Sequence, residues 1–161
     1  MKVFFYGTLR KGGIFSRSLP EDRKITLCQL KGIRMYMLGQ FPGVQVTNDK
    51  KDFVVGEVVD FEGILSQEEW DAMITNMDRI ENTANGLFER SMIETPHGEA
   101  IIYLVTDDTL KVFGEDFKKY RDKDLEILTD WASVDPMIAD MVPTLNKEKD
   151  NVTIRTAGQK D

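Results

Sequence analysis

The sequence predicts an α+β protein, and three observations support this prediction. The first two thirds of the chain alternate strand-like runs with turns marked by glycine, one stretch between them changes to helical periodicity, and the last third is helical in pattern. The 161 residues are enough for one domain and few for two. A content of 41% hydrophobic and 30% charged residues fits a globular chain with one core, which excludes wholesale disorder.

Runs rich in β-branched and aromatic residues predict at least five strands. They cover residues 2–6, 30–38, 53–61, 89–93 and 100–105. The last two runs flank the turn sequence Pro96-His97-Gly98 and therefore predict a hairpin. Residues 14–22 are expected to be a connection, and residues 39–43, with a glycine at each end, a loop.

An amphipathic helix is predicted after the third strand, because apolar residues recur there at positions i, i+3, i+4 and i+7. These residues are Trp70, Met73, Ile74 and Met77. Ser66 and Glu69 stand three apart, the spacing of a capping box, and mark the start of the helix. Its end is expected between Asp78 and residues 82–86, where asparagines and glycine favour a left-handed exit.

The last third of the chain is expected to be one or two helices over residues 118–141, interrupted by Pro136 and Pro143. The apolar residues at helical spacing are Leu125, Leu128, Trp131 and Ala132. Residues 1–145 are then a single domain. Residues 146–161 are polar and charged and are expected to form a mobile tail.

Charge and hydropathy exclude several classes of partner. The chain has 21 basic and 28 acidic residues, a net charge of −7, and its basic residues are scattered, so binding to nucleic acid is not expected. No run approaches the roughly 18 apolar residues of a membrane helix. Residues 1–5 lead directly into a turn rather than into a signal-peptide core. We therefore expect a cytoplasmic protein without a membrane partner.

The scarcity of cysteine and histidine narrows the possible chemistry. Cys28 is the one cysteine and cannot form an internal disulfide, which agrees with a reducing compartment. With His97 as the one histidine, a structural zinc site and a Ser-His-Asp triad are not expected, and no metal is predicted. His97 itself fits a solvated turn better than a catalytic base. Any chemistry is left to carboxylates, phenols and backbone amides.

Glu81 lies one turn beyond Met77 on the apolar face of the predicted helix. Two interpretations are open. In the first, the helix has frayed and Glu81 faces water or pairs with Arg79 or Arg90. In the second, Glu81 is partly buried at the helix C-terminus, where desolvation and the helix dipole raise its pKa. Such a carboxylate is suited to act as a general base and then as a general acid.

The segment Tyr6-Gly7-Thr8-Leu9-Arg10-Lys11-Gly12-Gly13 follows the first strand. Successive amides in a glycine-containing turn can converge on an anion, and Gly7 permits a ligand to approach the backbone closely. The segment is not a phosphate-binding P-loop, because the second glycine is followed by Gly13 and Ile14 rather than by lysine and a hydroxyl residue. The alternative interpretation is an ordinary surface connection.

Six short segments follow one another along the chain: residues 5–12 (FYGTLRKG), 38–44 (LGQFPGV), 55–58 (VGEV), 77–81 (MDRIE), 88–90 (FER) and 100–103 (AIIY). Taken in this order, they resemble the γ-glutamylcyclotransferase-like (AIG2-like) family. The resemblance covers roughly residues 2–105. Two positions depart from the family pattern: Met77 replaces a leucine, and Phe88 replaces a tyrosine and so removes a hydroxyl.

This resemblance implies a small, partly open mixed β-barrel with flanking helices and a pocket at one end, followed here by a helical extension over 107–145. Members of the family cleave γ-glutamyl amides without a cofactor. The α-amine of the substrate attacks its own γ-carbonyl and releases 5-oxoproline and an amine or peptide. The implied partner is a small γ-glutamyl molecule, and the implied enzyme class is a cyclase-type acyltransferase or lyase.

The resemblance also assigns site residues by position. Glu81 is implied as the proton-transferring group. The backbone amides of Tyr6, Gly7, Thr8 and Leu9 are implied to hold the substrate carboxylate or the developing oxyanion. For Tyr103, either its hydroxyl serves the pocket or it is a barrel residue whose hydroxyl bonds a neighbour. Glu57 receives no catalytic part.

Two other functions remain open on the same barrel. One is a non-catalytic module that binds a small molecule or a protein, and the other is a hydrolase in which Glu81 activates water and free glutamate is released. The apolar residues of 118–141 are expected to cover the outer surface of the barrel, to form a dimer contact or to close over the pocket. The protein is accordingly expected to be a monomer or a homodimer.

Overall fold

The computed structural model describes residues 1–149 and 154–155 of the chain. Within these residues a seven-stranded sheet comprises β1 (Lys2–Phe5), β2 (Lys24–Lys31), β5 (Phe53–Asp60), β6 (Phe88–Thr95), β7 (Gly98–Val105), β9 (Asn146–Lys149) and β10 (Ile154–Arg155). A three-stranded sheet comprises β3 (Ile33–Met37), β4 (Pro42–Val46) and β8 (Ile127–Leu128). The helices are α1 (Gln67–Ile80), α2 (Asp107–Arg121) and the short α3 (Pro136–Ala139).

Strand β1 lies in the middle of the larger sheet, whose order is β10-β6-β7-β1-β5-β2-β9. It pairs antiparallel with β5, where Phe5 faces Glu57, and parallel with β7, where Val3 faces Ile101. Because β1 ends between these two strands, the segment that follows it begins next to Glu57 on one side and close to Tyr103 on the other.

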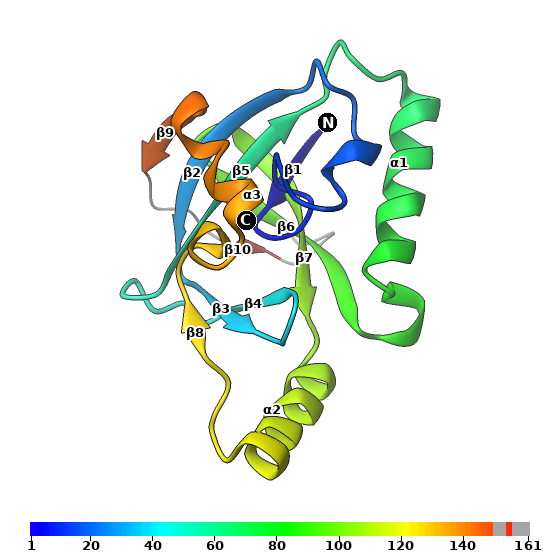
Figure 1. Cartoon of the computed structure of the whole chain (residues 1–161). Helices are drawn as coiled ribbons and strands as arrows, with labels where there is room; N and C mark the ends of the chain where they lie inside the picture. The colour runs from blue at the N-terminus through cyan, green and yellow to red at the C-terminus, as the bar shows by residue number, and fades with distance from the viewer. Residues whose placement is uncertain (150–153, 156–161) are drawn as a thin grey trace.

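Both faces of the larger sheet are buried, as the alternation of side chains along β1 shows. Phe4 and Tyr6 belong to a core cluster that also includes residues of the three-stranded sheet. Val3 and Phe5 belong to a second cluster, which includes Ile74 of α1. Figure 1 shows α1 on one side of the sheet and β3 and β4 on the other. The two sheets enclose the first cluster without closing into one ladder, which confirms a partly open mixed barrel with flanking helices.

Helix α1 has the ends that its sequence predicts. The Ser66 hydroxyl accepts a hydrogen bond from the Glu69 amide at 3.1 Å, and the Glu69 carboxylate accepts one from the Ser66 amide at 3.0 Å, so the capping box is confirmed. After the helix, Asn82 has a φ of 54° and Gly86 a φ of 72°, which is the left-handed exit expected there. The position of Glu81 as the C-cap follows from these two ends.

The early strands differ from the prediction at their boundaries. The predicted strand 30–38 is two strands that meet at Gly32, whose φ of 85° requires glycine. The first of these strands already begins at Lys24, and the predicted loop 39–43 ends early because β4 starts at Pro42. Proline is tolerated there because it occupies the first position of its strand.

The prediction of one or two helices over 118–141 is wrong. Helix α2 spans Asp107–Arg121, and the chain leaves it through Asp122 in a left-handed conformation. It then runs extended, so that β8 pairs with β3, and it forms only short helical turns afterwards. Trp131 and Ile138 do not cover the outside of the barrel, because they are buried in the same cluster as Phe4.

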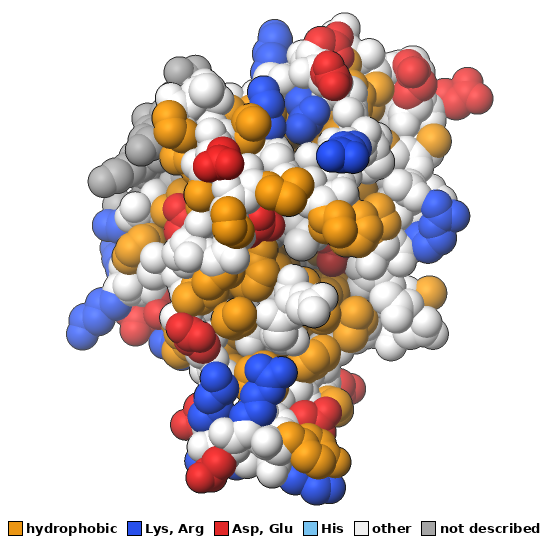
Figure 2. All heavy atoms as spheres, viewed as in Figure 1, with side chains coloured by type: hydrophobic (Ala, Val, Ile, Leu, Met, Phe, Trp, Pro, Cys, Tyr) orange, Lys and Arg blue, Asp and Glu red, His pale blue; other side chains and the backbone are white. Residues whose placement is uncertain are grey.

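Two short parts of the predicted mobile tail belong to the sheet. Strand β9 pairs parallel with β2, and β10 pairs antiparallel with β6. The other residues of that tail lie outside the described residues. None of the helices in the described part combines the length and apolarity needed to cross a bilayer. Figure 2 shows basic and acidic side chains mixed around the rim of one face, with hydrophobic side chains over its middle.

Candidate active site

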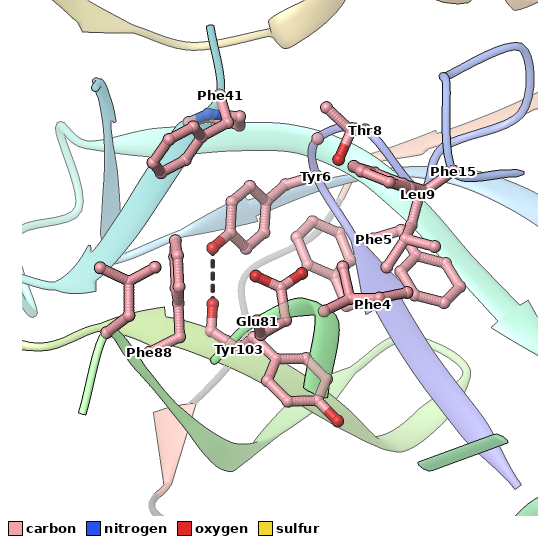
Figure 3. Close-up of a pocket in the computed structure, with 14 residues that line it drawn as sticks. Phe4, Phe5, Tyr6, Thr8, Leu9, Phe15, Phe41, Glu81, Phe88 and Tyr103 are labelled. Carbon is pink, nitrogen blue, oxygen red and sulfur yellow. Dashed lines mark hydrogen bonds between the residues drawn. The ribbon is translucent and has the colours of Figure 1, made fainter. Parts of the chain in front are cut away.

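A cavity of about 170 Å³ lies at the end of β1. Its walls come from β1 and the loop that follows it, from the C-terminus of α1, and from β6 and β7 (Figure 3). All six residues that the sequence singled out line this one cavity: Tyr6, Gly7, Thr8, Leu9, Glu81 and Tyr103. The fold therefore brings the helix C-cap and the glycine-containing turn to the same place, although Gly13, at the end of the turn, and Glu81 are 68 positions apart in the sequence.

Glu81 carries the one carboxyl group among the described residues of the lining, and Figure 3 shows it in the middle of the cavity. Its amide donates to the Met77 carbonyl at 2.9 Å, which fixes the backbone. Burial raises the pKa of its side chain from 4.5 to about 7. Among the described residues, no hydrogen bond or ion pair involves its carboxylate. Its protonation state therefore changes near neutral pH.

The arginines near Glu81 in the sequence have other partners. Arg90 Nη1 lies 3.2 Å from Asp78 Oδ2, and Arg79 Nη2 donates to Asn76 Oδ1. The interpretation in which Glu81 pairs with one of them is therefore wrong. The interpretation of a partly buried acid at the helix C-terminus agrees with the structure, with desolvation as the cause of the raised pKa.

The second functional element is residues 6–13, which we call the 6–13 loop. Its fold is held by backbone hydrogen bonds from the Arg10 amide to Gly7 O (2.9 Å) and from the Gly13 amide to Arg10 O (2.8 Å). In the part of the chain that the structure describes, the amides of Gly7, Thr8 and Leu9 donate no hydrogen bond. Since all three residues line the cavity, these donors suit an anionic or strongly dipolar guest.

Gly7 is required for the way this loop meets the β3–β4 hairpin. A Cβ atom at residue 7 would lie 2.7 Å from Pro42 Cγ, which is closer than real Cβ contacts. Pro42 and Phe41 line the cavity beside the loop. The loop therefore packs directly on the segment that also supplies an aromatic wall.

The hydroxyl of Tyr103 does not serve the cavity. It donates to Asp78 Oδ1 at 2.6 Å, and Figure 3 shows it pointing away from Glu81. The interpretation in which a neighbour satisfies this hydroxyl is therefore the correct one. Tyr103 contributes instead through its carbonyl, which accepts a hydrogen bond from the Tyr6 hydroxyl at 2.6 Å. That bond ties the end of β1 to β7.

The apolar part of the lining was not singled out from the sequence. It consists of Phe4, Phe5, Phe15, Phe41, Pro42, Ile80, Leu87 and Phe88. Phe41 packs against Phe88 at 6.2 Å between ring centroids and edge-on against Phe113 of α2 at 5.8 Å. The signal that was available is the sequence around Phe41-Pro42, which resembles a family loop but carries no chemistry of its own.

The arrangement suits proton transfer beside a bound polar group. A carboxyl that titrates near pH 7 lies in a mainly apolar cavity with free amide donors on its wall. Within the described residues, no group of three or more His, Cys, Asp or Glu side chains is placed to hold a metal ion. The groups available in the cavity are therefore the Glu81 carboxyl, which can accept or donate a proton, and the backbone amide dipoles of the 6–13 loop.

Comparisons with known proteins agree with this architecture. An uncharacterized protein from Pyrococcus horikoshii has a similar crystal structure, with a TM-score of 0.54 at 16% identity over 83% of this chain and 92% of that one. The solution structure of protein ytfP from Escherichia coli gives a TM-score of 0.51 at 22% identity over 81% and 94% of the two chains. At these identities the likeness concerns the fold.

The sequence comparisons reach further than the fold. A search of curated proteins finds no match. The model of the family described as "Gamma-glutamyl cyclotransferase, AIG2-like" matches residues 3–132, which extends beyond the resemblance at 2–105 and takes in α2 and β8. Because this match covers most of the 161 residues, the chain belongs to the γ-glutamyl cyclotransferase, AIG2-like family.

Proposed function

We propose that the protein cleaves a γ-glutamyl amide by cyclisation, in which the α-amine of the substrate attacks its own γ-carbonyl carbon. The products are 5-oxoproline and an amine or peptide. The observation that carries this proposal is the unpaired Glu81 carboxyl in the cavity, whose pKa of about 7 suits a group that must both accept and donate a proton. Family membership supports the same reaction class.

In this mechanism Glu81 first takes a proton from the substrate's α-ammonium, which frees the nitrogen lone pair for attack. The new C–N bond closes the five-membered ring, and the γ-carbonyl oxygen becomes an oxyanion. Glu81 then gives its proton to the departing nitrogen as the amide C–N bond breaks. The ring nitrogen still carries two protons after the attack, and it gives one of them to the now deprotonated Glu81, which passes this proton to the released amine. The 5-oxoproline nitrogen thus keeps one of the three ammonium protons, the amine leaves as an ammonium with the other two, and Glu81 returns to its starting carboxylate.

The rest of the cavity acts by positioning the substrate. The free amides of Gly7, Thr8 and Leu9 hold its α-carboxylate or the developing oxyanion, as preorganised dipoles do. The apolar walls exclude water and favour the folded conformation in which amine and carbonyl lie within reach of one another. Since the nucleophile belongs to the substrate, the protein needs no nucleophilic side chain.

The test is product analysis on a panel of γ-glutamyl amides that includes γ-glutamyl dipeptides, glutathione and γ-glutamyl-ε-lysine. We expect 5-oxoproline from at least one of them, and a loss of at least about 100-fold in kcat for Glu81→Gln. Glu68→Gln, an exposed change on the same helix, is the matched control and should leave the rate unchanged. Free glutamate in place of 5-oxoproline would indicate a hydrolase, and binding without turnover would indicate a non-catalytic module.

A further inference from the structure

Three charged side chains next to the cavity take no part in the proposed chemistry. Arg10 of the 6–13 loop is completely buried, and Glu57 of β5 is 1% exposed. Arg10 Nε donates to Glu57 Oε2 at 3.2 Å, and its Nη1 donates to Asp130 Oδ1 at 2.6 Å. The other oxygen of Glu57 accepts the Lys11 amide at 2.8 Å. The loop is thus joined to β5 and to a residue 120 positions away in the sequence.

Burying these charges carries a large desolvation free energy, so the network is a weak source of fold stability. Buried charges lose their hydration, and replacing a buried ion pair by packed apolar residues is often neutral or favourable. Here Arg10 Nη2 has no hydrogen-bond partner among the described residues, so its desolvation is only partly compensated. Such a network is better explained by what it holds in place than by the stability that it adds.

What the network holds is the backbone of the 6–13 loop. The amide of Arg10 donates to Gly7 O and its carbonyl accepts from Gly13, so the residue with the buried side chain also closes both turns of the loop. The Phe15 amide donates to Thr8 O at 3.1 Å and ties the end of the loop to its start. Fixing Arg10 therefore fixes the orientation of the free amides at Gly7, Thr8 and Leu9.

Asp130 is itself held firmly. Its Oδ1 also accepts the Ala132 amide at 2.9 Å, and the preceding carbonyl of Thr129 accepts the Val55 amide at 2.7 Å. We call residues 129–139 the C-terminal segment. It is anchored to β5 at its start and by the burial of Trp131 and Ile138 in the core.

The C-terminal segment also touches the loop without charged groups. Gly12 has a φ of 91°, and a Cβ atom there would lie 2.3 Å from the carbonyl oxygen of Met137. The side chains of Ile14, which follows the loop, and of Met137 are exposed. The loop is therefore enclosed between β5 and the C-terminal segment.

We propose that Arg10, Glu57 and Asp130 are positioning residues, which hold the amides of the 6–13 loop in place for the substrate carboxylate. This role rests on the proposed function. It makes the C-terminal segment a part of the active site, although Asp130 does not line the cavity. Loss of the network should weaken substrate binding more than it slows the bound substrate, because a carboxylate that does not react is held equally in the ground and transition states.

The decisive variant is Asp130→Ala, since the side chain of Asp130 is 31% exposed and its removal leaves the core filled. We expect KM for the best substrate to rise at least about 10-fold and kcat to change less than about 3-fold. Asp130→Asn keeps an oxygen acceptor for Arg10 and should restore part of the loss. A variant that only lowers the folded fraction would reduce the apparent kcat at constant KM, and that result would overturn the proposal.

Asp135→Ala is the matched control. Asp135 accepts hydrogen bonds from the Met137 and Ile138 amides in the same segment, and among the described residues it forms no hydrogen bond or ion pair with Arg10. We expect its KM to stay within about 2-fold of the wild-type value, the scale of an exposed cap that binds no substrate. An equal rise of KM in both variants would mean that the charge network has no special role.

A second measurement does not depend on turnover. Hydrogen exchange of the Arg10 and Phe15 amides, which close the loop, should be at least about 10-fold faster in Asp130→Ala than in wild type, and unchanged in Asp135→Ala. Unaltered exchange in Asp130→Ala would show that the network does not hold the loop. If wild type forms no 5-oxoproline, the proposed function fails, and exchange still decides whether the network positions these amides.

Discussion

Glu57 and Glu81 are both acids beside the 6–13 loop, and they differ in exposure and in their partners: Glu57 is buried, and Glu81 is half-buried. Glu57 faces the Arg10 guanidinium and the Lys11 amide, which oppose the rise in its pKa that burial causes. Glu81 has neither a cation nor a donor among the described residues, and burial alone raises its pKa to about 7. A paired acid fixes the backbone that surrounds it, whereas an unpaired acid can exchange its proton with a guest. The same residue type is thus paired beside the loop and, among the described residues, unpaired in the cavity.

The largest expected change is a loss in the free energy of unfolding when the Arg10 cation that pairs with Glu57 is removed. Arg10→Met is expected to lower the free energy of unfolding by about 3–5 kcal/mol, because a buried carboxylate then lacks a partner. Urea denaturation at pH 7 measures this loss. The double variant Arg10→Met/Glu57→Leu should recover most of it, since both charges are then removed. A loss below about 1 kcal/mol in the single variant would show that Glu57 does not depend on Arg10.

A gain in the free energy of unfolding should follow from replacing the carboxyl group of Glu81. The pKa of Glu81 in the folded protein, about 7, lies above its ordinary value of 4.5. The protonated form is therefore favoured by folding, and this contribution is complete below pH 4.5 and is lost as the pH rises through 7. Glu81→Gln should increase the free energy of unfolding at pH 8 by up to about 3 kcal/mol and leave it unchanged at pH 4. Equal stability of both proteins at pH 8 would contradict a half-buried Glu81 with a raised pKa.

The smallest expected effect concerns how the proposed turnover by the wild-type protein depends on pH. If the base is Glu81, kcat/KM should fall about tenfold per pH unit below pH 7 and level off above it, because only the carboxylate accepts the α-ammonium proton. A pH–rate profile on the best γ-glutamyl substrate measures this limb. Asp130→Ala should shift the whole profile downward without moving the limb. A limb near pH 4.5 would indicate an acid with an ordinary environment.

Local signals were sufficient for one half of the candidate site. The capping box at Ser66 and the 3.6-residue period of α1 fix which side of the helix faces the sheet, and Glu81 follows one turn after Met77. The turn after β1 was recognisable from its glycines and its place behind a strand. Each of these features depends on residues a few positions apart, where backbone geometry leaves few alternatives.

The other half depended on contacts between distant residues. The spacing of Leu125, Leu128 and Trp131 is compatible with a helix. In the structure, however, Leu128 pairs with the edge of β3, and Trp131 is buried in the core cluster inside the barrel. The Tyr103 hydroxyl bonds Asp78 because α1 lies against β7 at that level. Neither of these two outcomes follows from a local sequence periodicity. Each depends on which surfaces the other packed elements leave uncovered.

The sequence by itself determined the strand-rich α+β character, the helix with its caps, and the pairing of an acid with a glycine-containing turn as the candidate chemistry. Only the tertiary structure decided that, within the described part of the chain, Glu81 has no partner and Glu57 has two, and that Asp130 reaches the loop across 120 residues. The physical reason is that burial and partnership are properties of the packed chain. Glutamate is the same residue type in the sequence whether the fold places its carboxylate beside a guanidinium or in a cavity.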